Sequence, residues 1–138
     1  MAKAKQNARP RPASDAAPVP WKTAILLFWP VAGAGAALDL WSKSAVFEWL
    51  SRTETFEYTL IDGFLNFIWR ENAGAAFSAF HGWRPFLITI AAVALGVVIA
   101  VFFSRKVTSK LALFALGCIT AGIIGNLWDR IFNEGRVR

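Results

Sequence analysis

The sequence predicts a membrane all-α fold with three transmembrane helices and a small β-sheet between the first helix and the second. Composition is the first observation: 56% of the 138 residues are hydrophobic and only 17% are charged, as in chains that lie in a bilayer. The second observation is that the apolar residues form three runs, each close to the roughly twenty residues that a helix needs to cross a membrane. The third is that Lys and Arg gather before the first run and between the second and third, which is typical of the cytoplasmic side.

The formal net charge of +6 would also suit a protein that binds nucleic acid. The basic residues lie in the connections, however, and no basic face with interleaved aromatic residues is visible. We therefore expect membrane lipid as a partner, and no nucleic acid. Cys118 is the only cysteine and His81 the only histidine. Because protein metal sites need clustered ligands, we also expect no metal.

Residues 1–20 are rich in alanine, proline and basic side chains and lack hydrophobic periodicity, which predicts a disordered cytoplasmic tail. The first membrane helix is expected at about residues 21–41, because Trp21 and Trp41 suit the two membrane–water interfaces. We expect Pro30 to kink this helix, since a proline inside a helix removes one backbone hydrogen bond.

The second membrane helix is expected at about residues 84–103 and the third at about 110–128. Each run has the length that a membrane span requires. With the tail and the connection at 104–110 both in the cytoplasm, the first and third helices end together on the outer side. Polar residues near these two ends would then lie on the same side of the membrane.

The connection between the first two helices, at about residues 45–83, is expected to form an outer β region. Segments 55–61 and 64–70 are rich in β-branched and aromatic residues, and Asp62-Gly63 separates them. An Asp-Gly pair between two such segments predicts a β-hairpin. Its aromatic content suits the outer membrane–water boundary, although an ordinary interfacial loop fits the composition equally well.

Two charged residues lie near the outer end of the first helix. Asp39 and Lys43 are four residues apart, so they share one helix face and can form an ion pair. One interpretation is a paired charge that anchors the helix end. Another is a Ser–Lys dyad, in which Ser42, Ser44 or Ser78 is the nucleophile and Lys43 the base. The dyad is the weaker interpretation, because Lys43 can form an ion pair with Asp39 instead of contacting a serine.

Polar side chains also mark the outer end of the third helix. Asn126 and Asp129 are three residues apart on one face, and Gly122 and Gly125 should leave space for another element beside them. Asp129 and Asp39 could form a carboxylate pair whose pKa values are split, with one group acting as a base and the other as an acid. The residues alone do not establish that these two carboxylates meet.

Three segments together resemble the lipoprotein signal peptidases, the signal peptidase II family. They are Asp-Leu-Trp-Ser-Lys at 39–43, Asn-Ala-Gly-Ala-Ala-Phe-Ser at 72–78 and Gly-Asn-Leu-Trp-Asp-Arg at 125–130. Each segment alone is a weak signal. Their order and spacing, with matching helices, make the resemblance specific, and it extends over about residues 21–138.

The resemblance implies four membrane helices, of which this chain would carry three, and an aromatic β-sheet on the periplasmic side. It implies a multi-pass aspartic endopeptidase of the bacterial inner (cytoplasmic) membrane, with a cytoplasmic N-terminus and a site at the periplasmic face. The implied substrates are prolipoproteins that already carry a diacylglyceryl group, cleaved just before the lipidated cysteine. No cofactor and no metal are implied.

The resemblance also implies roles for polar residues of this chain. Asn72 and Arg130 would hold the substrate backbone near the scissile bond, and Asn126 would orient neighbouring polar groups. Asp39 and Lys43 would brace the site from the first helix. The implied substrate-binding or supporting residues are Asp39, Lys43, Asn72, Gly74, Asn126, Asp129 and Arg130.

The family pattern replaces the Asp39–Asp129 pair as the catalytic groups. In this family the aspartate that corresponds to Asp129 is not catalytic, and we expect it to pair with a basic neighbour. The two catalytic aspartates belong to later segments, and residues 135–138 look like the lead-in to the first. We therefore expect the dyad after Arg138, a peptidase domain at 21–138 that is incomplete at its C-terminal side, and no proteolysis by this chain alone.

A different class of function also remains open from the residues. A non-enzymatic polytopic membrane subunit, or a small transporter, could use Asp39, Lys43 and Asp129 as a relay of charges inside the membrane. The segment at 72–78 favours the peptidase, because a transporter has no evident need for it in a connection outside the membrane.

Overall fold

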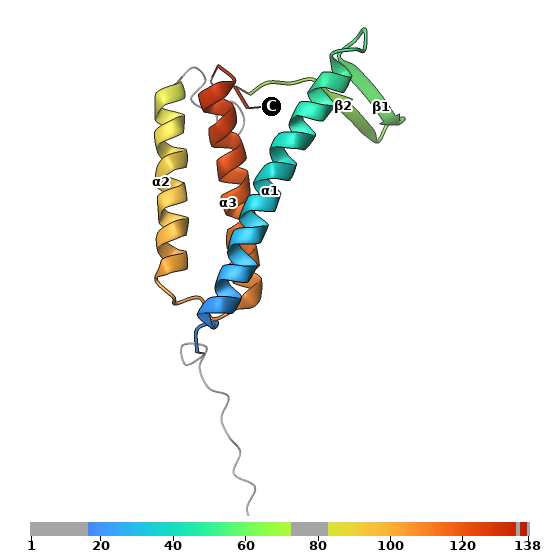
Figure 1. The fold of residues 1–138 in the computed structure, drawn as a ribbon. Helices are drawn as coiled ribbons and strands as arrows, with labels where there is room; N and C mark the ends of the chain where they lie inside the picture. Colours follow the sequence, from blue (N-terminus) through green and yellow to red (C-terminus); the bar gives the residue numbers. More distant parts are fainter. Residues whose placement is uncertain (1–16, 73–82, 135, 138) are drawn as a thin grey trace, which may run out of the picture.

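The computed structural model describes residues 17–72, 83–134 and 136–137, and Figure 1 shows their arrangement. Most of the predicted tail, residues 1–16, lies outside the described residues. The prediction of an all-α membrane fold with a small sheet is confirmed. In chain order the elements are helix α1 (Trp21–Leu50), strands β1 (Glu57–Ile61) and β2 (Leu65–Ile68), and helices α2 (Arg84–Phe103) and α3 (Lys110–Phe132).

The three helices are each long and apolar enough to cross a membrane, as predicted. α2 begins and ends where the sequence indicated, but the predicted ends of the other two helices were wrong. α1 continues through Pro30 and past Trp41 to Leu50, and α3 continues to Phe132. A helix of 30 residues is about 45 Å long. This exceeds the roughly 30 Å hydrocarbon layer, so a helix of this length tilts in the membrane or extends beyond it.

The last turns of α1 are an amphipathic extension that sequence reasoning assigned to the β region. Residues 42–50 contain no proline or glycine, and Phe47 and Leu50 are buried on one face. An interfacial tryptophan, Trp41, suggested a helix end there, but nothing in the local sequence stops the helix. The outer β region therefore starts after α1 and not at residue 45.

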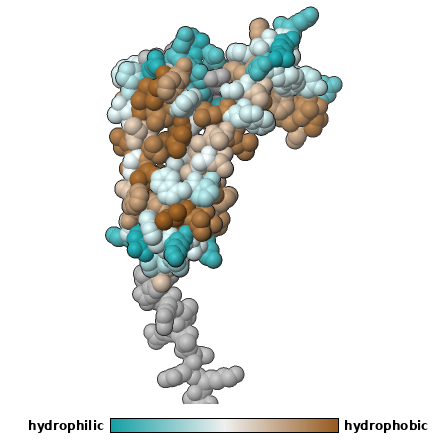
Figure 2. Space-filling model, in the orientation of Figure 1, coloured by the Kyte–Doolittle hydropathy of each residue, from teal (hydrophilic) through white to brown (hydrophobic). Residues whose placement is uncertain are grey.

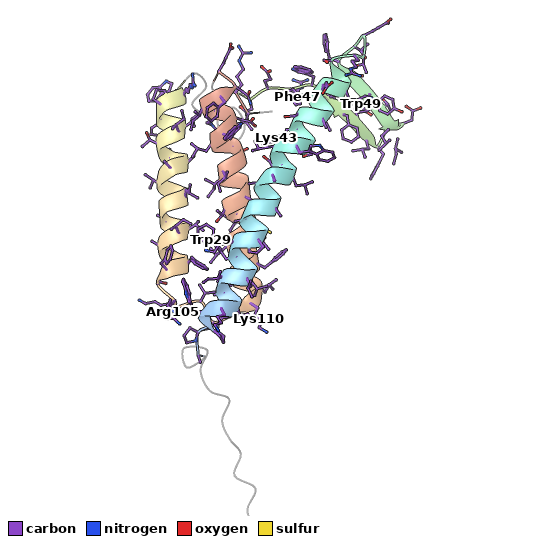
Figure 3. The ribbon with its side chains drawn as sticks, viewed as in Figure 1. Trp29, Lys43, Phe47, Trp49, Arg105 and Lys110 are labelled. Atoms are coloured by element: carbon purple, nitrogen blue, oxygen red, sulfur yellow. The ribbon has the colours of Figure 1, made fainter. Side chains whose placement is uncertain are left out.

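The predicted hairpin is present, with β1 and β2 paired antiparallel. Asp62 and Gly63 lie in its turn, where Gly63 has a φ of 68°, a value that glycine adopts without steric cost. The hairpin attaches to the end of α1 through aromatic rings. Trp49 contacts Tyr58 with ring centroids 4.7 Å apart, and Figure 3 shows Trp49 beside the hairpin.

Small residues set the contact between α1 and α3. A Cβ atom at Gly35 would lie 2.8 Å from the Cβ of Ala121, and one at Gly117 would lie 2.9 Å from Val31 Cγ1 and 3.1 Å from the carbonyl oxygen of Phe28. Membrane helices approach closely where such residues remove side-chain volume. α3 also packs against α2 (Figure 1), and α1 meets α2 directly where the rings of Phe28 and Phe102 stack with their centroids 4.3 Å apart.

The two ends of the bundle differ in charge. The basic end lies where α1 begins and α2 is connected to α3, and Figure 3 marks it by Arg105 and Lys110. The opposite end, where α1 and α3 finish and α2 begins, is called the polar end below. In Figure 2 a largely hydrophobic band lies between hydrophilic surfaces at these ends. The exposed basic residues of the basic end are Lys22, Arg105, Lys106 and Lys110.

Two glycines of α3 allow a matched test of the helix contact. We expect Gly117→Ala to lower the free energy of unfolding by about 1–3 kcal/mol, because the new methyl group would collide with α1. Gly122→Ala is the control, because a Cβ there meets nothing within 4 Å. It should leave stability unchanged or raise it by up to about 1 kcal/mol through helix propensity. Equilibrium unfolding in detergent measures both, and equal effects would contradict the close contact at Gly117.

Candidate functional site

An ammonium group lies at the centre of the polar residues of α1 and α3. Lys43 Nζ is 2.7 Å from Asp39 Oδ2 and 3.2 Å from Asp129 Oδ2. It also donates a hydrogen bond of 3.4 Å to Asn126 Oδ1. We call these four residues the Lys43 cluster; Figure 3 labels Lys43 on α1, near the polar end. The predicted pairings of Lys43 with Asp39 and of Asp129 with a basic neighbour are present.

Helix periodicity and one glycine explain why these residues meet. Asp39 and Lys43 are one turn apart on α1, and Asn126 and Asp129 are nearly one turn apart on α3. Gly125 is buried where the helices touch, and a Cβ there would collide with the carboxylate of Asp39. The prediction that Gly125 makes room for another element was therefore correct. At Gly122 the space is open, because a Cβ there would meet nothing within 4 Å among the described residues, so the same prediction for Gly122 stays a prediction.

Burial makes the ion pairs of the Lys43 cluster important for stability. The side chain of Asp129 is 1% exposed and that of Lys43 is 15% exposed. The second carboxylate oxygen of Asp129, Oδ1, accepts a hydrogen bond of 2.5 Å from Asn133 Nδ2. Both oxygens of this buried carboxylate thus have partners, as a charge away from water requires.

The geometry of the cluster suits a brace better than a nucleophile. The ammonium of Lys43 has three hydrogens and three oxygen acceptors, so its contacts are taken by Asp39, Asp129 and Asn126 and not by a serine hydroxyl. The hydroxyl of Ser42 donates to the backbone oxygen of Asp39 at 3.1 Å. Ser44 is exposed, and Ser78 lies outside the described residues. A Ser–Lys dyad has no support in these contacts.

Arg130 lies in the last turn of α3, beyond the Lys43 cluster. Its Nη1 donates to the backbone oxygen of Asn126 at 3.2 Å. Arg84, in the first turn of α2, donates from Nε to the backbone oxygen of Arg130 and from Nη2 to that of Ile131, both at 2.8 Å. A guanidinium satisfies the unpaired carbonyls at a helix C-terminus and opposes its negative dipole. Arg84 therefore fixes the turn that carries Arg130.

Asn72 is tied to the chain that follows α3. It forms an isolated antiparallel bridge with Val137. The backbone N–H of Asn72 donates to the carbonyl oxygen of Val137 at 2.8 Å, and the backbone N–H of Val137 donates to the carbonyl oxygen of Asn72 at 3.0 Å. Arg136 Nη1 lies 2.7 Å from Glu71 Oε2 beside the bridge. The predicted site residues of α1, of the connection and of α3 thus come to one end of the bundle. Gly74 lies outside the described residues.

An open cleft of about 470 Å³ lies at the polar end. Asn133 lines this cleft and also binds Asp129, so the cleft adjoins the Lys43 cluster. A smaller groove of about 330 Å³ includes Lys43 and Phe47 in its wall. The residues that line the larger cleft are Ser44, Phe47, Glu48, Ser51, Trp69, Glu71, Phe132, Asn133, Glu134 and Arg136.

Sequence reasoning missed Arg84, Glu71 and Arg136. Arg84 had a usable signal, because a basic residue at the start of one helix lies near the C-terminus of its antiparallel neighbour. The pair of Glu71 and Arg136 had no such signal in the sequence, since the two residues belong to different connections and are 65 residues apart. Within 17–72, 83–134 and 136–137, no three His, Cys, Asp or Glu side chains are grouped so that they could hold a metal ion.

Comparison with known proteins finds a family model and relatives that match most of the chain. The family model of signal peptidase (SPase) II matches residues 31–138. The chain is 43% identical over 107 residues to a lipoprotein signal peptidase of Rhodopirellula baltica, an alignment that covers 76% of this chain and 48% of that protein. It is 40% identical over 105 residues to one of Synechocystis, covering 75% and 63% of the two chains. No solved structure gives a significant match.

A third relative, the lipoprotein signal peptidase of Cellvibrio japonicus, is 40% identical over 100 residues, which cover 70% of this chain and 57% of that protein. The chain thus spans about half to three fifths of the length of these relatives. The range matched by the family model, residues 31–138, includes the three segments that carry the Lys43 cluster, Asn72 and Arg130. The chain belongs to the signal peptidase II family.

Proposed function

We propose that the chain is part of a membrane aspartic endopeptidase that removes signal peptides from diacylglyceryl-modified prolipoproteins, cutting before the lipidated cysteine. The observation that carries this proposal is the convergence of the Lys43 cluster, Arg130 and Asn72 at one end of three apolar helices. The relatives are lipoprotein signal peptidases, and this favours the peptidase over a transporter or a non-enzymatic membrane subunit.

Each polar residue has a role in this proposal. Asn72 and Arg130 hold the substrate backbone, and Asn126 orients the groups around them. Asp39 and Lys43 brace α1 against α3, with Asp129 as the buried counter-charge. None of the three segments of the resemblance supplies the catalytic aspartates, so we assign these to other segments of the whole protein.

We further propose that the chain lies in a bacterial inner membrane with its basic end in the cytoplasm. The exposed Lys and Arg residues at the basic end support this orientation. The polar end, with the hairpin, then faces the periplasm. Phe64 is 83% exposed, and Phe56, Leu60 and Ile61 are also exposed on the hairpin. Such a surface suits the membrane–water boundary, where both the lipid and the peptide of the substrate can be reached.

Substrate holding can be tested in the whole protein by its cleavage of a lipidated prolipoprotein. We expect Asn72→Ala and Arg130→Ala each to lower kcat/KM by about ten- to a hundredfold, the loss expected for a hydrogen bond to a charged or developing-charge group. Arg52→Gln is the control, because Arg52 pairs only locally with Glu48 on the exposed end of α1 in the described contacts. Unchanged cleavage by either alanine variant would remove that residue from the site.

Bracing by Lys43 can be tested through stability. We expect Lys43→Met to lower the free energy of unfolding by about 3–5 kcal/mol, because the buried carboxylate of Asp129 loses its counter-charge. Adding Asp129→Asn should recover part of this loss, since the more deeply buried carboxylate is then replaced by a neutral amide and only the partly exposed Asp39 keeps its charge. The two single variants and the double variant form a cycle that equilibrium unfolding in detergent can measure. Additive losses would contradict the pairing.

Orientation can be tested by cysteine labelling of intact cells. In a Cys118→Ala background, we expect a maleimide that cannot cross the inner membrane to label Glu54→Cys, which lies at the polar end. Thr108→Cys, at the basic end, should be labelled only after lysis. Both positions are exposed in the structure, so access to the reagent alone decides the result. The reverse pattern would invert the proposed topology.

A further inference from the structure

We infer that Glu71 and Arg136 are positioning residues, whose ion pair clasps the segment after α3 to the segment that carries Asn72. The inference rests on the proposed function, because Asn72 is the residue that would hold the substrate. Neither Glu71 nor Arg136 lies in the three segments at 39–43, 72–78 and 125–130, although Arg136 lies in the lead-in at 135–138. Their contact is given by the structure alone, with Arg136 Nη1 2.7 Å from Glu71 Oε2.

The clasp has two parts that depend on each other. The backbone part is the bridge between Asn72 and Val137, with hydrogen bonds of 2.8 and 3.0 Å. A single bridge is a small unit, since even a two-stranded hairpin is only marginally stable in water. The side-chain part is the Glu71–Arg136 ion pair, which joins the residues that immediately precede the two bridge partners. It adds a second point of attachment between the same segments.

The clasp is anchored to the Lys43 cluster. The backbone amide of Arg136 donates to the carbonyl of Asn133 at 2.9 Å, which turns the chain back after α3. Asn133 in turn donates from its amide to the carbonyl of Asp129 at 2.7 Å and from its side chain to the Asp129 carboxylate. A series of ion pairs and hydrogen bonds thus links Lys43 to Glu71 through Asp129, Asn133 and Arg136.

The direction of side chains along an extended segment explains what the clasp controls. Successive side chains of such a segment point to opposite faces, so binding Glu71 on one face directs Asn72 to the other. The ion pair therefore determines the orientation of Asn72 without touching a substrate. Val137 is fixed by the same clasp, and by resemblance it leads into the segment of the first catalytic aspartate. Glu71 and Arg136 would hold the substrate-binding asparagine and this segment in one register.

Hydrogen exchange of the chain in detergent tests the clasp itself. The amides of Asn72 and Val137 both donate in the bridge. We expect Glu71→Gln and Arg136→Gln to raise their exchange rates about two- to fivefold, the effect of losing an exposed ion pair. The difference should shrink at about 1 M salt, which screens exposed charges. Arg52→Gln is the matched control, since it breaks an exposed Glu–Arg pair at the same end.

The charge-swapped variant, Glu71→Arg with Arg136→Glu, separates positioning from a general loss of structure. It should restore slow exchange, because the ion pair is rebuilt with its charges reversed. In the whole protein, the single variants should lower kcat about two- to fivefold with little change in KM, and the swap should restore it. Arg52→Gln should cleave normally.

The outcomes separate the clasp from the proposed function. Unchanged exchange in Glu71→Gln, or a swap that does not restore it, overturns the clasp. Faster exchange with unchanged cleavage overturns the positioning role and leaves the proposed function standing. Full cleavage by Asn72→Ala and Arg130→Ala overturns the proposed function, whatever the exchange rates show.

Discussion

The ammonium group of Lys43 is the interaction on which the polar end depends. It lies between the carboxylates of Asp39, on its own helix, and Asp129, on α3. Removing an ion from water costs several kilocalories per mole, so these groups are tolerated only if they meet. The helices must therefore pack in a register that brings α1 and α3 together at this level. Any relative sliding that parts the charges leaves a buried carboxylate without its partner.

The glycine and alanine contacts of α1 and α3 make this register possible. Gly117 and Gly35 bring the helix backbones close, and Gly125 admits the carboxylate of Asp39 against α3. Inside a membrane the hydrophobic effect does not favour one helix register over another, because lipid tails are as apolar as leucine. The small residues allow α1 and α3 to approach closely in several registers, and the ion pairs of Lys43 favour one of these registers. Shape and charge thus specify the same contact.

How far the sequence could predict this structure depends on the range of each interaction. The pairing of Asp39 with Lys43 follows from spacing on one helix, and the Asp-Gly turn follows from local chemistry. The end of α1 was not predictable from Trp41, because the helix continues wherever its buried face finds partners, here the rings of the hairpin. The Glu71–Arg136 pair could not be predicted either, because no local sequence pattern indicates a contact between two connections that lie far apart in the chain.

The site residues are held by two different kinds of structure. The Lys43 cluster joins membrane-spanning helices, where burial makes its ion pairs strong and the register rigid. Asn72 comes from a connection outside the helices, where a bridge of two hydrogen bonds and a partly exposed ion pair hold it. Exposed pairs contribute at most about 1 kcal/mol, so this part of the site can open at little cost. The two parts of the polar end therefore differ in strength. The Lys43 cluster opposes any sliding of α1 along α3, whereas the attachment of Asn72 can be broken without separating the buried charges.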